Sequence, residues 1–270
     1  MVDHLINALS QPIDAESLAI FRCLFGFLMA VQLILSRKYT INFFKHSPCN
    51  FYFELFPFIR PVKNWMQVVI IAAIIFAIGL SLGIFYQVCA IGFFLTFTYL
   101  FLCDKSRYRD RDYLACILAL FFCVADGSNA FSLEHWLFKT PPETIPLWNL
   151  RLFQYQFLLA FTFSGLNKFN HDWICRGMPI KLQMQFYKGI FIRYIPSLKE
   201  LLLKLWPAIA YSWFAFIAEW VPLWLIYFQV LVIPSLCLFL LYQGLQCILY
   251  GVKYYPWIHL AMLILFIGGQ

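Results

Sequence analysis

Lys168 is the residue of this sequence that is best placed for acid–base chemistry. It directly follows an apolar stretch, in the run Ser164-Gly165-Leu166-Asn167-Lys168. A lysine at such a boundary commonly extends its ammonium group to the lipid headgroups. If the side chain lies in a partly dry pocket instead, its charged form is disfavoured, and the neutral amine can act as a general base. The residues alone leave both alternatives open.

Two ionisable residues lie inside apolar runs, where an unpaired charge costs several kcal/mol. Counted by the helical rise from the ends of these runs, Arg22 lies about 8 Å and Glu219 about 12 Å from the same membrane face. Their similar depth predicts a buried ion pair, formed directly or through one polar neighbour. Asp126 and Arg151 lie near the same face. For these four residues we predict a structural rather than a catalytic role.

The composition of the chain shows which kind of fold must position these residues. Of its 270 residues, 63% are hydrophobic, 20% are aromatic and only 12% are charged, whereas a soluble domain is about half apolar and about a quarter charged. A bilayer requires every backbone amide to be satisfied internally, so that helices or a closed barrel are the options. Because the apolar runs are continuous rather than alternating, they predict helices.

The apolar segments are long enough to suggest how many helices cross the membrane. A spanning helix needs about 20 mostly apolar residues, and we expect eight helices, at 17–36, 65–85, 86–103, 112–127, 147–167, 206–227, 230–250 and 255–269. Aromatic residues in 37–64, and a capping-box pattern at Ser197 and Glu200, are typical of segments that lie in the interface. The sequence thus predicts an all-α integral membrane protein with about eight transmembrane helices and interfacial helices in its long loops. We expect residues 1–270 to form one membrane domain, without a separate soluble domain.

The basic residues are distributed unevenly between the two faces of this topology. Eight spans place both termini on one face, which we call side A, and the long loops on the other, side B. Side B carries most of the 20 Lys and Arg residues, so the positive-inside rule makes it cytoplasmic. In the alternative interpretation, many of these cations line a site for an anionic substrate, and the positive-inside rule then gives the wrong orientation.

The cysteines give no sign of a metal centre. The chain has nine of them, without any Cys-x-x-Cys pair, so we expect neither a zinc site nor a redox dithiol. Most lie inside apolar runs, where cysteine acts as a small hydrophobic residue.

Several dispersed segments resemble the membrane core of the vitamin K-dependent γ-glutamyl carboxylases. Related bacterial proteins share this core as the horizontally transferred transmembrane (HTTM) domain. The matching segments occur in the same order along both chains. They are residues 12–22 and 24–26, residues 102–106 and 113–114, Asp126, residues 146–149, and residues 165–173 together with Gly177. The resemblance covers nearly the whole chain.

The resemblance implies a specific chemistry for Lys168. In the carboxylases, a membrane-embedded lysine at the matching position deprotonates vitamin K hydroquinone. Oxygen then converts the quinol to a strong base, which removes a γ-proton from a substrate glutamate so that CO2 can add. The matching pocket residues, which would bind such a reduced quinone, are Asp104, Lys105, Arg111, Asn167, Trp173 and Gln243.

The sequence departs from the carboxylases at three points. Arg111 and Gln243 stand where the carboxylases have functional histidines, and the chain stops after the membrane core, so we expect no luminal substrate-recognition domain. We therefore expect a quinol-linked membrane enzyme with Lys168 as its general base, but not an authentic glutamate carboxylase. The alternative is a non-catalytic maturation, assembly or immunity factor for a secreted peptide. A transporter is a weaker hypothesis, since the sequence shows no inverted repeat.

The expected surroundings follow from the same considerations. The expected partners are the lipid bilayer and a secreted peptide or protein as substrate. We do not expect the protein to bind nucleic acid. The protein should be a multi-pass protein of a bacterial inner membrane or of the endoplasmic reticulum. The resemblance implies that side B faces away from the cytoplasm, which disagrees with the charge distribution, and we favour the resemblance.

Overall fold

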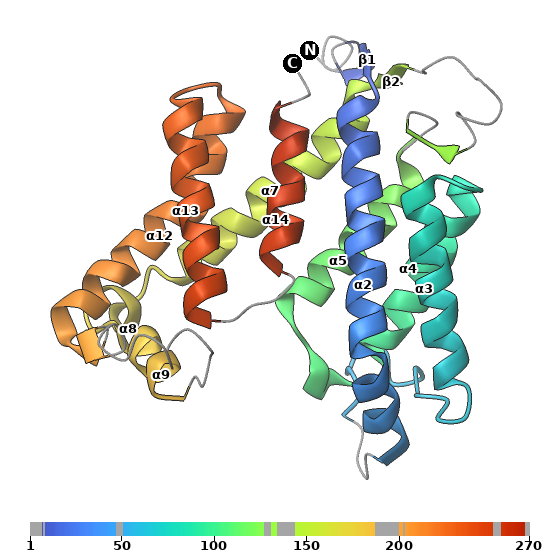
Figure 1. The fold of residues 1–270 in the computed structure, drawn as a ribbon, viewed down its shortest axis with the longest axis horizontal. Coiled ribbons are helices and arrows are strands. Elements are labelled where there is room, and N and C mark those ends of the chain that lie inside the picture. Colours follow the sequence, from blue (N-terminus) through green and yellow to red (C-terminus); the bar gives the residue numbers. More distant parts are fainter. Residues whose placement is uncertain are drawn as a thin grey trace. The chain divides into compact units, whose positions relative to one another are not determined.

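The computed structural model describes residues 7, 9–46, 51–126, 131–133, 144–186, 200–201, 203–250 and 255–267. Helices make up most of this part of the chain (Figure 1). The chain divides into two compact units. The first comprises Met1–Phe153 and Ala261–Gln270, and the second comprises Gln154–Leu260. Two helices, α7 (Leu147–Asn167) and α14 (Tyr255–Ile267), contribute residues to both units.

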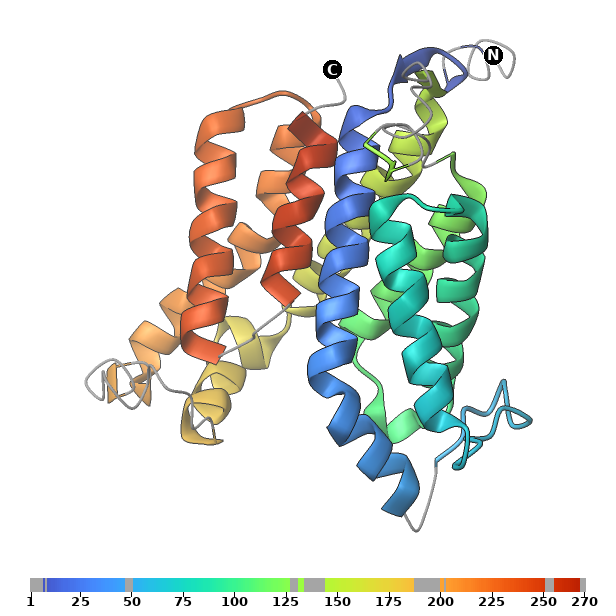
Figure 2. The same cartoon turned by 45° about the vertical axis from the view of Figure 1, so that its right-hand side comes forward.

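The first unit is built on a long helix and a series of shorter helices that pack in sequence order. These are α2 (Glu16–His46), α3 (Met66–Leu82), α4 (Tyr86–Leu102) and α5 (Asp110–Val124). Neighbours along the chain lie side by side (Figure 2). A short 3-10 helix, η1 (Lys105–Arg107), joins α4 to α5. The strands β1 (Pro12–Asp14) and β2 (Thr144–Pro146) pair antiparallel, with Ile13 opposite Ile145.

Aromatic rings fill the core of the first unit. Phe21 and Phe25 on α2 contact Phe122 on α5, with ring centroids 5.8 and 5.4 Å apart. Phe153, at the start of α7, contacts Phe122 at 4.8 Å, and Phe93 on α4 contacts Phe25 at 6.0 Å. Offset and edge-to-face ring pairs of this kind add to the area that they bury. The long helix α2 is therefore tied to α4, α5 and α7 through one cluster of rings.

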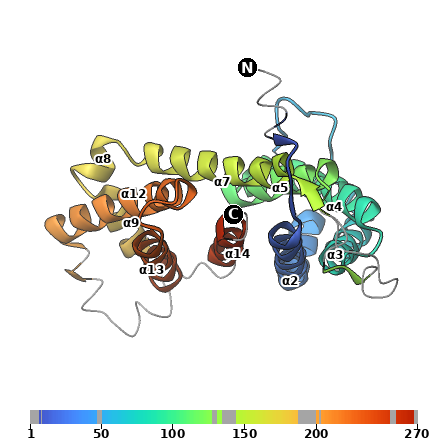
Figure 3. The ribbon, with the colours of Figure 1, turned by 90° about the horizontal axis from the view of Figure 1, so that it is seen from above.

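In the second unit, α12 (Leu205–Tyr227) contacts the elements on both sides of it in the chain. It pairs with α13 (Val232–Tyr250) and also contacts the short helices α8 (His171–Ile174) and α9 (Met178–Phe186) (Figure 3). The C-terminal part of α7 runs antiparallel to α12, since Tyr155 Oη bonds Tyr227 Oη at 2.9 Å and Trp224 Nε1 donates to Thr162 Oγ1 at 2.7 Å. These contacts with α7 lie in the second half of α12, whereas its first half contacts α8 and α9.

The helices expected from the apolar runs are all present, with boundaries close to those expected, apart from the first. That helix was expected to end near residue 36, but α2 continues to His46. Residues 37–46 are therefore helical, and the expected interfacial loop is reduced to the turns of 51–65. Phe51, Phe58 and Trp65 in that loop are exposed. Ser197 lies outside the described residues, so the capping box remains a prediction.

Among the residues that the structure describes, two helices are long and apolar enough to cross a membrane, by length and composition alone. They are Glu16–His46 and Trp206–Tyr227, which has a mean hydropathy of 1.5. Shorter apolar helices cover Met66–Leu82, Tyr86–Leu102, Val232–Cys247 and Trp257–Phe266. Each compact unit thus contains one helix that is long and apolar enough to cross a membrane.

A glycine contact on α2 provides a test of the packing in the first unit. A Cβ atom at Gly26 would lie 2.6 Å from the backbone nitrogen of Ser81 and 2.7 Å from the carbonyl oxygen of Ala77. We predict that Gly26→Ala forces α2 away from α3 and lowers the free energy of unfolding by about 1–3 kcal/mol. The measurement is thermal unfolding of the purified protein in detergent, followed by tryptophan fluorescence.

Gly244→Ala is the matched control for this substitution. Gly244 lies in α13, and a Cβ there would meet nothing within 4 Å. Because alanine favours helix over glycine, this variant should unfold at the wild-type temperature or above it. Equal destabilisation by the two substitutions would contradict the close α2–α3 contact.

Candidate functional site

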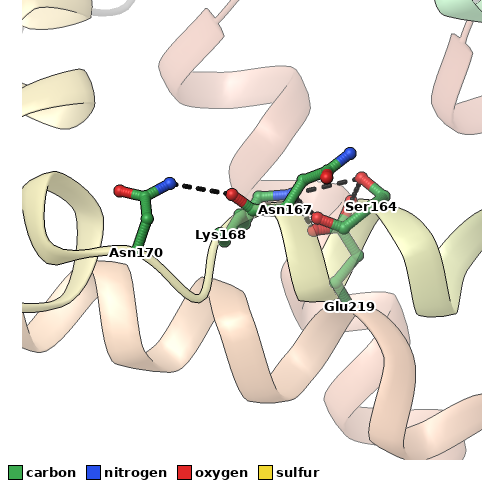
Figure 4. A network of polar contacts seen from close by, with 5 residues as sticks. All are labelled: Ser164, Asn167, Lys168, Asn170 and Glu219. Carbon is green, nitrogen blue, oxygen red and sulfur yellow. Dashed lines mark hydrogen bonds and ion pairs between the residues drawn. The ribbon is translucent and has the colours of Figure 1, made fainter.

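Lys168 lies directly after the last residue of α7, and its ammonium group makes several polar contacts. Nζ donates to the carbonyl oxygen and to Oγ of Ser164, one helical turn earlier, both at 3.3 Å. It also forms an ion pair with Oε2 of Glu219, on α12. The ring of Trp173, on α8, lies 5.5 Å from Nζ. The lysine is therefore held by groups from three helices, and Figure 4 shows its contacts with Ser164 and Glu219.

Ser164 closes the contact between Lys168 and Glu219 into a three-residue network. Its hydroxyl donates to Oε1 of Glu219 at 2.7 Å, so that both carboxylate oxygens are engaged. The side chain of Lys168 is 14% exposed and that of Glu219 is 11% exposed. Each charge thus has its counter-ion and a neutral hydrogen-bonding group, which is the condition under which a buried pair can persist.

A glycine on α7 lets α12 approach closely enough to form this network. A Cβ at Gly165 would lie only 2.4 Å from Cδ1 of Trp220, the residue after Glu219. The indole ring therefore packs directly on the backbone of α7, one residue after Ser164. This contact fixes which turn of α12 faces the end of α7.

The pair lies well inside an apolar helix. Counted by the helical rise, Glu219 is about 20 Å along α12 from Leu205 and about 12 Å from Tyr227. We expected Lys168 at the side B boundary, far in depth from Glu219, and the structure instead places the two in contact. The difference arises because α7 ends beside the middle of α12. The chain then continues into α8 and α9, which cover the first half of α12.

The segment after Lys168 is shaped by local hydrogen bonds. Oδ1 of Asn170 accepts from the backbone nitrogen of Trp173 at 3.0 Å and so caps α8. Its Nδ2 donates to the carbonyl oxygen of Asn167 at 2.8 Å. This cap positions Trp173 over the ammonium group of Lys168. Asn167, expected to contact a cofactor, has an exposed side chain.

Gln243, another expected cofactor residue, is buried on α13 beside a histidine that sequence reasoning missed. Its Oε1 lies 3.2 Å from Nδ1 of His259, on α14. Both residues are 3% exposed. His259 could have been found from the sequence, because an ionisable side chain within an apolar helix such as Trp257–Phe266 is a functional candidate by itself.

The other expected pocket residues belong to the first unit. Asp104 is buried, and its Oδ1 accepts from the backbone nitrogen of Ser106 at 2.8 Å. Lys105 is exposed and lies 3.7 Å from Glu54, while Nε of Arg111 lies 3.9 Å from Asp112. The structure therefore groups Lys168, Trp173 and Gln243 in one compact unit, and it describes Asp104, Lys105 and Arg111 within the other.

The residues expected to be structural charges have different environments. Arg22 is fully buried in the first unit, and its guanidinium donates to the carbonyl oxygen of Phe131 at 3.1 Å. Asp126 is exposed and Arg151 is half-buried. We expected Arg22 as the cation beside Glu219, and the structure shows Lys168 in that place. A contact between Arg22 and Glu219 remains a prediction.

The network can hold a proton at more than one place. Lys168 and Glu219 share a hydrogen bond, so the charged pair and the neutral pair differ only in the position of one proton. A further proton that reaches the network leaves both groups protonated, with one positive charge on the amine. The arrangement can therefore accept a proton from a neutral hydroxyl and stabilise the negative charge that remains.

Comparison with known proteins places the site in a family context. A family model described as the HTTM domain matches residues 10–269, which include residues of both compact units. This match confirms the resemblance to the domain family seen in the sequence motifs. No solved structure matches the chain.

The ion pair should be visible in the stability of single and double variants. Glu219→Leu and Lys168→Met each leave one buried charge without its partner, and each should lower the free energy of unfolding by about 3–5 kcal/mol. The double variant should recover most of this loss, because an apolar pair can replace a buried ion pair. Thermal unfolding in lipid nanodiscs measures all three.

An exposed ion pair nearby serves as the control. Asp172 and Arg176 lie 3.3 Å apart, and their side chains are 63% and 61% exposed. Asp172→Asn should therefore change the stability by less than about 1 kcal/mol. A double variant that is as unstable as the sum of the two single variants would contradict the coupling of Lys168 with Glu219.

Proposed function

The chain belongs to the HTTM domain family, and from this premise we propose that it is a multi-pass membrane protein that takes a proton from a lipid-soluble quinol. The observation that carries the proposal is the buried network of Lys168, Glu219 and Ser164 inside an apolar helix. Family membership supports a membrane protein related to the carboxylase core, and the network adds a group that can accept a proton there.

The environment of the network suits a ligand that arrives from the lipid. Ionisable side chains within membrane segments are rare, and they mark proton relays and ligand sites. A quinol is neutral and partitions into the bilayer, and it carries a hydroxyl that loses a proton more readily than an alcohol does. Trp173, which lies over the ammonium group, gives the site an aromatic surface for such a ring.

In the proposed reaction, Lys168 and Glu219 act as one acceptor. The pair takes up one proton from the ligand hydroxyl, and the ammonium group of Lys168 then stabilises the negative charge on the ligand oxygen. Ser164 holds the carboxylate through its hydroxyl and keeps it directed at the lysine. A bound quinol supplies the reducing equivalents for any later step. Since Arg111 and Gln243 replace carboxylase histidines, the proposal ends at proton removal and does not include glutamate carboxylation.

An oxygen-consumption assay tests this function. Quinols react with O2 mainly as their anions, giving the quinone and hydrogen peroxide, so a base that removes the proton accelerates this reaction. In nanodiscs, the wild-type protein should accelerate oxygen uptake by a short-chain menaquinol, and Lys168→Met should reduce the acceleration by about 100-fold or more. Lys168→Arg should also reduce it while preserving the ion pair, since arginine stays protonated and the neutral pair, in which the free amine is the base, cannot form.

Lys181→Met is the matched control, because Lys181 lies on α9 and takes no part in the network. It should leave oxygen uptake at the wild-type rate. A wild-type protein that neither binds nor oxidises the quinol, in cells that tolerate Lys168→Met, would exclude the proposal. A secreted peptide that then co-purifies with the protein would support the alternative, a non-catalytic maturation, assembly or immunity factor.

The topology that we propose has about eight spans, with both termini on side A. Helices at each of the expected positions support it, although several are shorter than a typical span. We propose that side B faces away from the cytoplasm, in a bacterial inner membrane or in the endoplasmic reticulum. Such an orientation lets the site meet a secreted peptide or protein as a second substrate.

Reporter fusions decide this topology. Alkaline phosphatase joined after residue 190 should be active, and the same reporter at the C-terminus should be inactive. Green fluorescent protein should give the reverse pattern. Two fusions with the same activity would contradict the odd number of spans, three, between these points and the membrane faces assigned to them.

A further inference from the structure

The helices α12 and α13 form a hairpin, and the turn that joins them, residues 228–231, is apolar (Figure 1). The sequence of the turn is Phe-Gln-Val-Leu, and no charged residue or histidine occurs between residues 220 and 252. Turns that face water usually contain Gly, Asn, Asp, Ser or Pro, because these residues tolerate the turn conformation or bond to the backbone. None of these residue types occurs in 228–231, so the turn does not have the composition of a water-exposed connection.

Four apolar residues at this end of the hairpin are exposed, and we call them the apolar tip. They are Phe228, Val230, Leu231 and Ile233, and between 49% and 75% of each is exposed. Single exposed apolar side chains are normal on a protein surface, but a contiguous group of them marks a surface that contacts lipid or another protein. The apolar tip therefore needs a surrounding other than water.

The backbone of the turn satisfies its amide groups internally. The backbone nitrogens of residues 228–230 donate to carbonyl oxygens of residues 224–226, over 2.8–3.1 Å. To do so, the chain adopts positive φ angles of 60° at Gln229 and 49° at Leu231, which residues other than glycine rarely adopt. Inside a bilayer no water can bond to a backbone donor, so a turn that lies there must satisfy its donors in this way.

The length of α13 indicates how deep the turn lies. Its 19 residues extend about 28 Å along the helix axis, whereas the hydrocarbon core is about 30 Å thick. With Tyr250 at the side B boundary, the start of α13 lies level with the end of the hydrocarbon on side A or inside it. Gln229, the polar residue of the turn, is exposed and uncharged, so its amide can reach the headgroups from just beneath them.

We infer that the apolar tip is inserted among the acyl chains of the membrane on side A, just beneath the headgroups. The tip then keeps the end of α12, which is about 12 Å from Glu219, away from bulk water. The inference goes beyond the proposed function and holds whether or not the protein binds a quinol. It also leaves the reporter pattern unchanged, because α12 and α13 together contribute an even number of spans.

Cysteine labelling in nanodiscs, which expose both membrane faces, measures whether water reaches the turn. Val230→Cys is compared with Glu54→Cys, because the side chain of Glu54 is 92% exposed. The reagent is a charged maleimide, and the labelling of the nine native cysteines is subtracted. The thiolate and the reagent are both excluded from hydrocarbon, so the cysteine at position 230 should react at least about 100-fold more slowly than that at position 54. In SDS, the two cysteines should react at similar rates.

A photoreactive residue identifies what covers the turn. In nanodiscs that contain a single phosphatidylcholine, Val230→p-benzoylphenylalanine should gain the mass of one lipid on irradiation, as read by mass spectrometry. Leu95→p-benzoylphenylalanine is the matched control, because Leu95 lies near the middle of α4 and is 59% exposed. It should give the same lipid adduct.

The other outcomes would overturn the inference. Equal labelling rates at positions 230 and 54 in nanodiscs would place the turn in water. An adduct of position 230 with another protein chain would make the apolar tip a protein interface, and no adduct where position 95 gives one would also exclude lipid contact. Val230→Cys should melt at the wild-type temperature in nanodiscs, so that slow labelling reports on a folded protein. A failed quinol assay would not affect these results.

Discussion

The contact between Lys168 and Glu219 is the constraint on which the second unit depends. Neither charge can remain inside an apolar helix without the other, so α7 and α12 must meet with these residues in register. The rest of the interface agrees with that register. Trp220 packs on Gly165, Trp224 bonds Thr162, and the pairing continues to the helix end. A shift of one turn would break the ion pair and move Trp220 away from Gly165.

The contact between Lys168 and Glu219 bears on both the stability of the second unit and the chemistry of the site. A buried charge pair contributes little to stability compared with an apolar pair of the same volume, so its presence needs another reason. Here the pair lies at the end of a helix, beneath Trp173, on the face of α7 that also carries Ser164 and Phe161. A network with no net charge that can take up one proton suits a site where water is scarce. Two such reasons are the register that the pair imposes on α7 and α12 and the proton uptake of the proposed function.

The sequence predicted the helices well, but it did not predict the partner of Lys168. Continuous apolar runs define helices locally, so their positions could be read directly. The extension of α2 to His46 keeps Thr40 and Phe44, which are four residues apart, on its buried face. The partner of Lys168 depends on where the chain returns after α8 and α9, which is a long-range property. The depth count that pairs Arg22 with Glu219 stays a prediction. His259 lies in an apolar helix, so it could have been identified from the sequence as an ionisable residue inside a helix.

Family membership and site chemistry are separate matters in this protein. The match over residues 10–269 shows the family, but it assigns no role to any single residue. The polar groups are few, and each one has to be judged from its own contacts. The sequence resemblance aligns Gln243 with a carboxylase histidine, and the structure places the imidazole of His259, from α14, beside it. The surroundings of a polar residue in a helical core thus depend on the neighbouring helices as well as on its own position, because packing brings several helices to the same point.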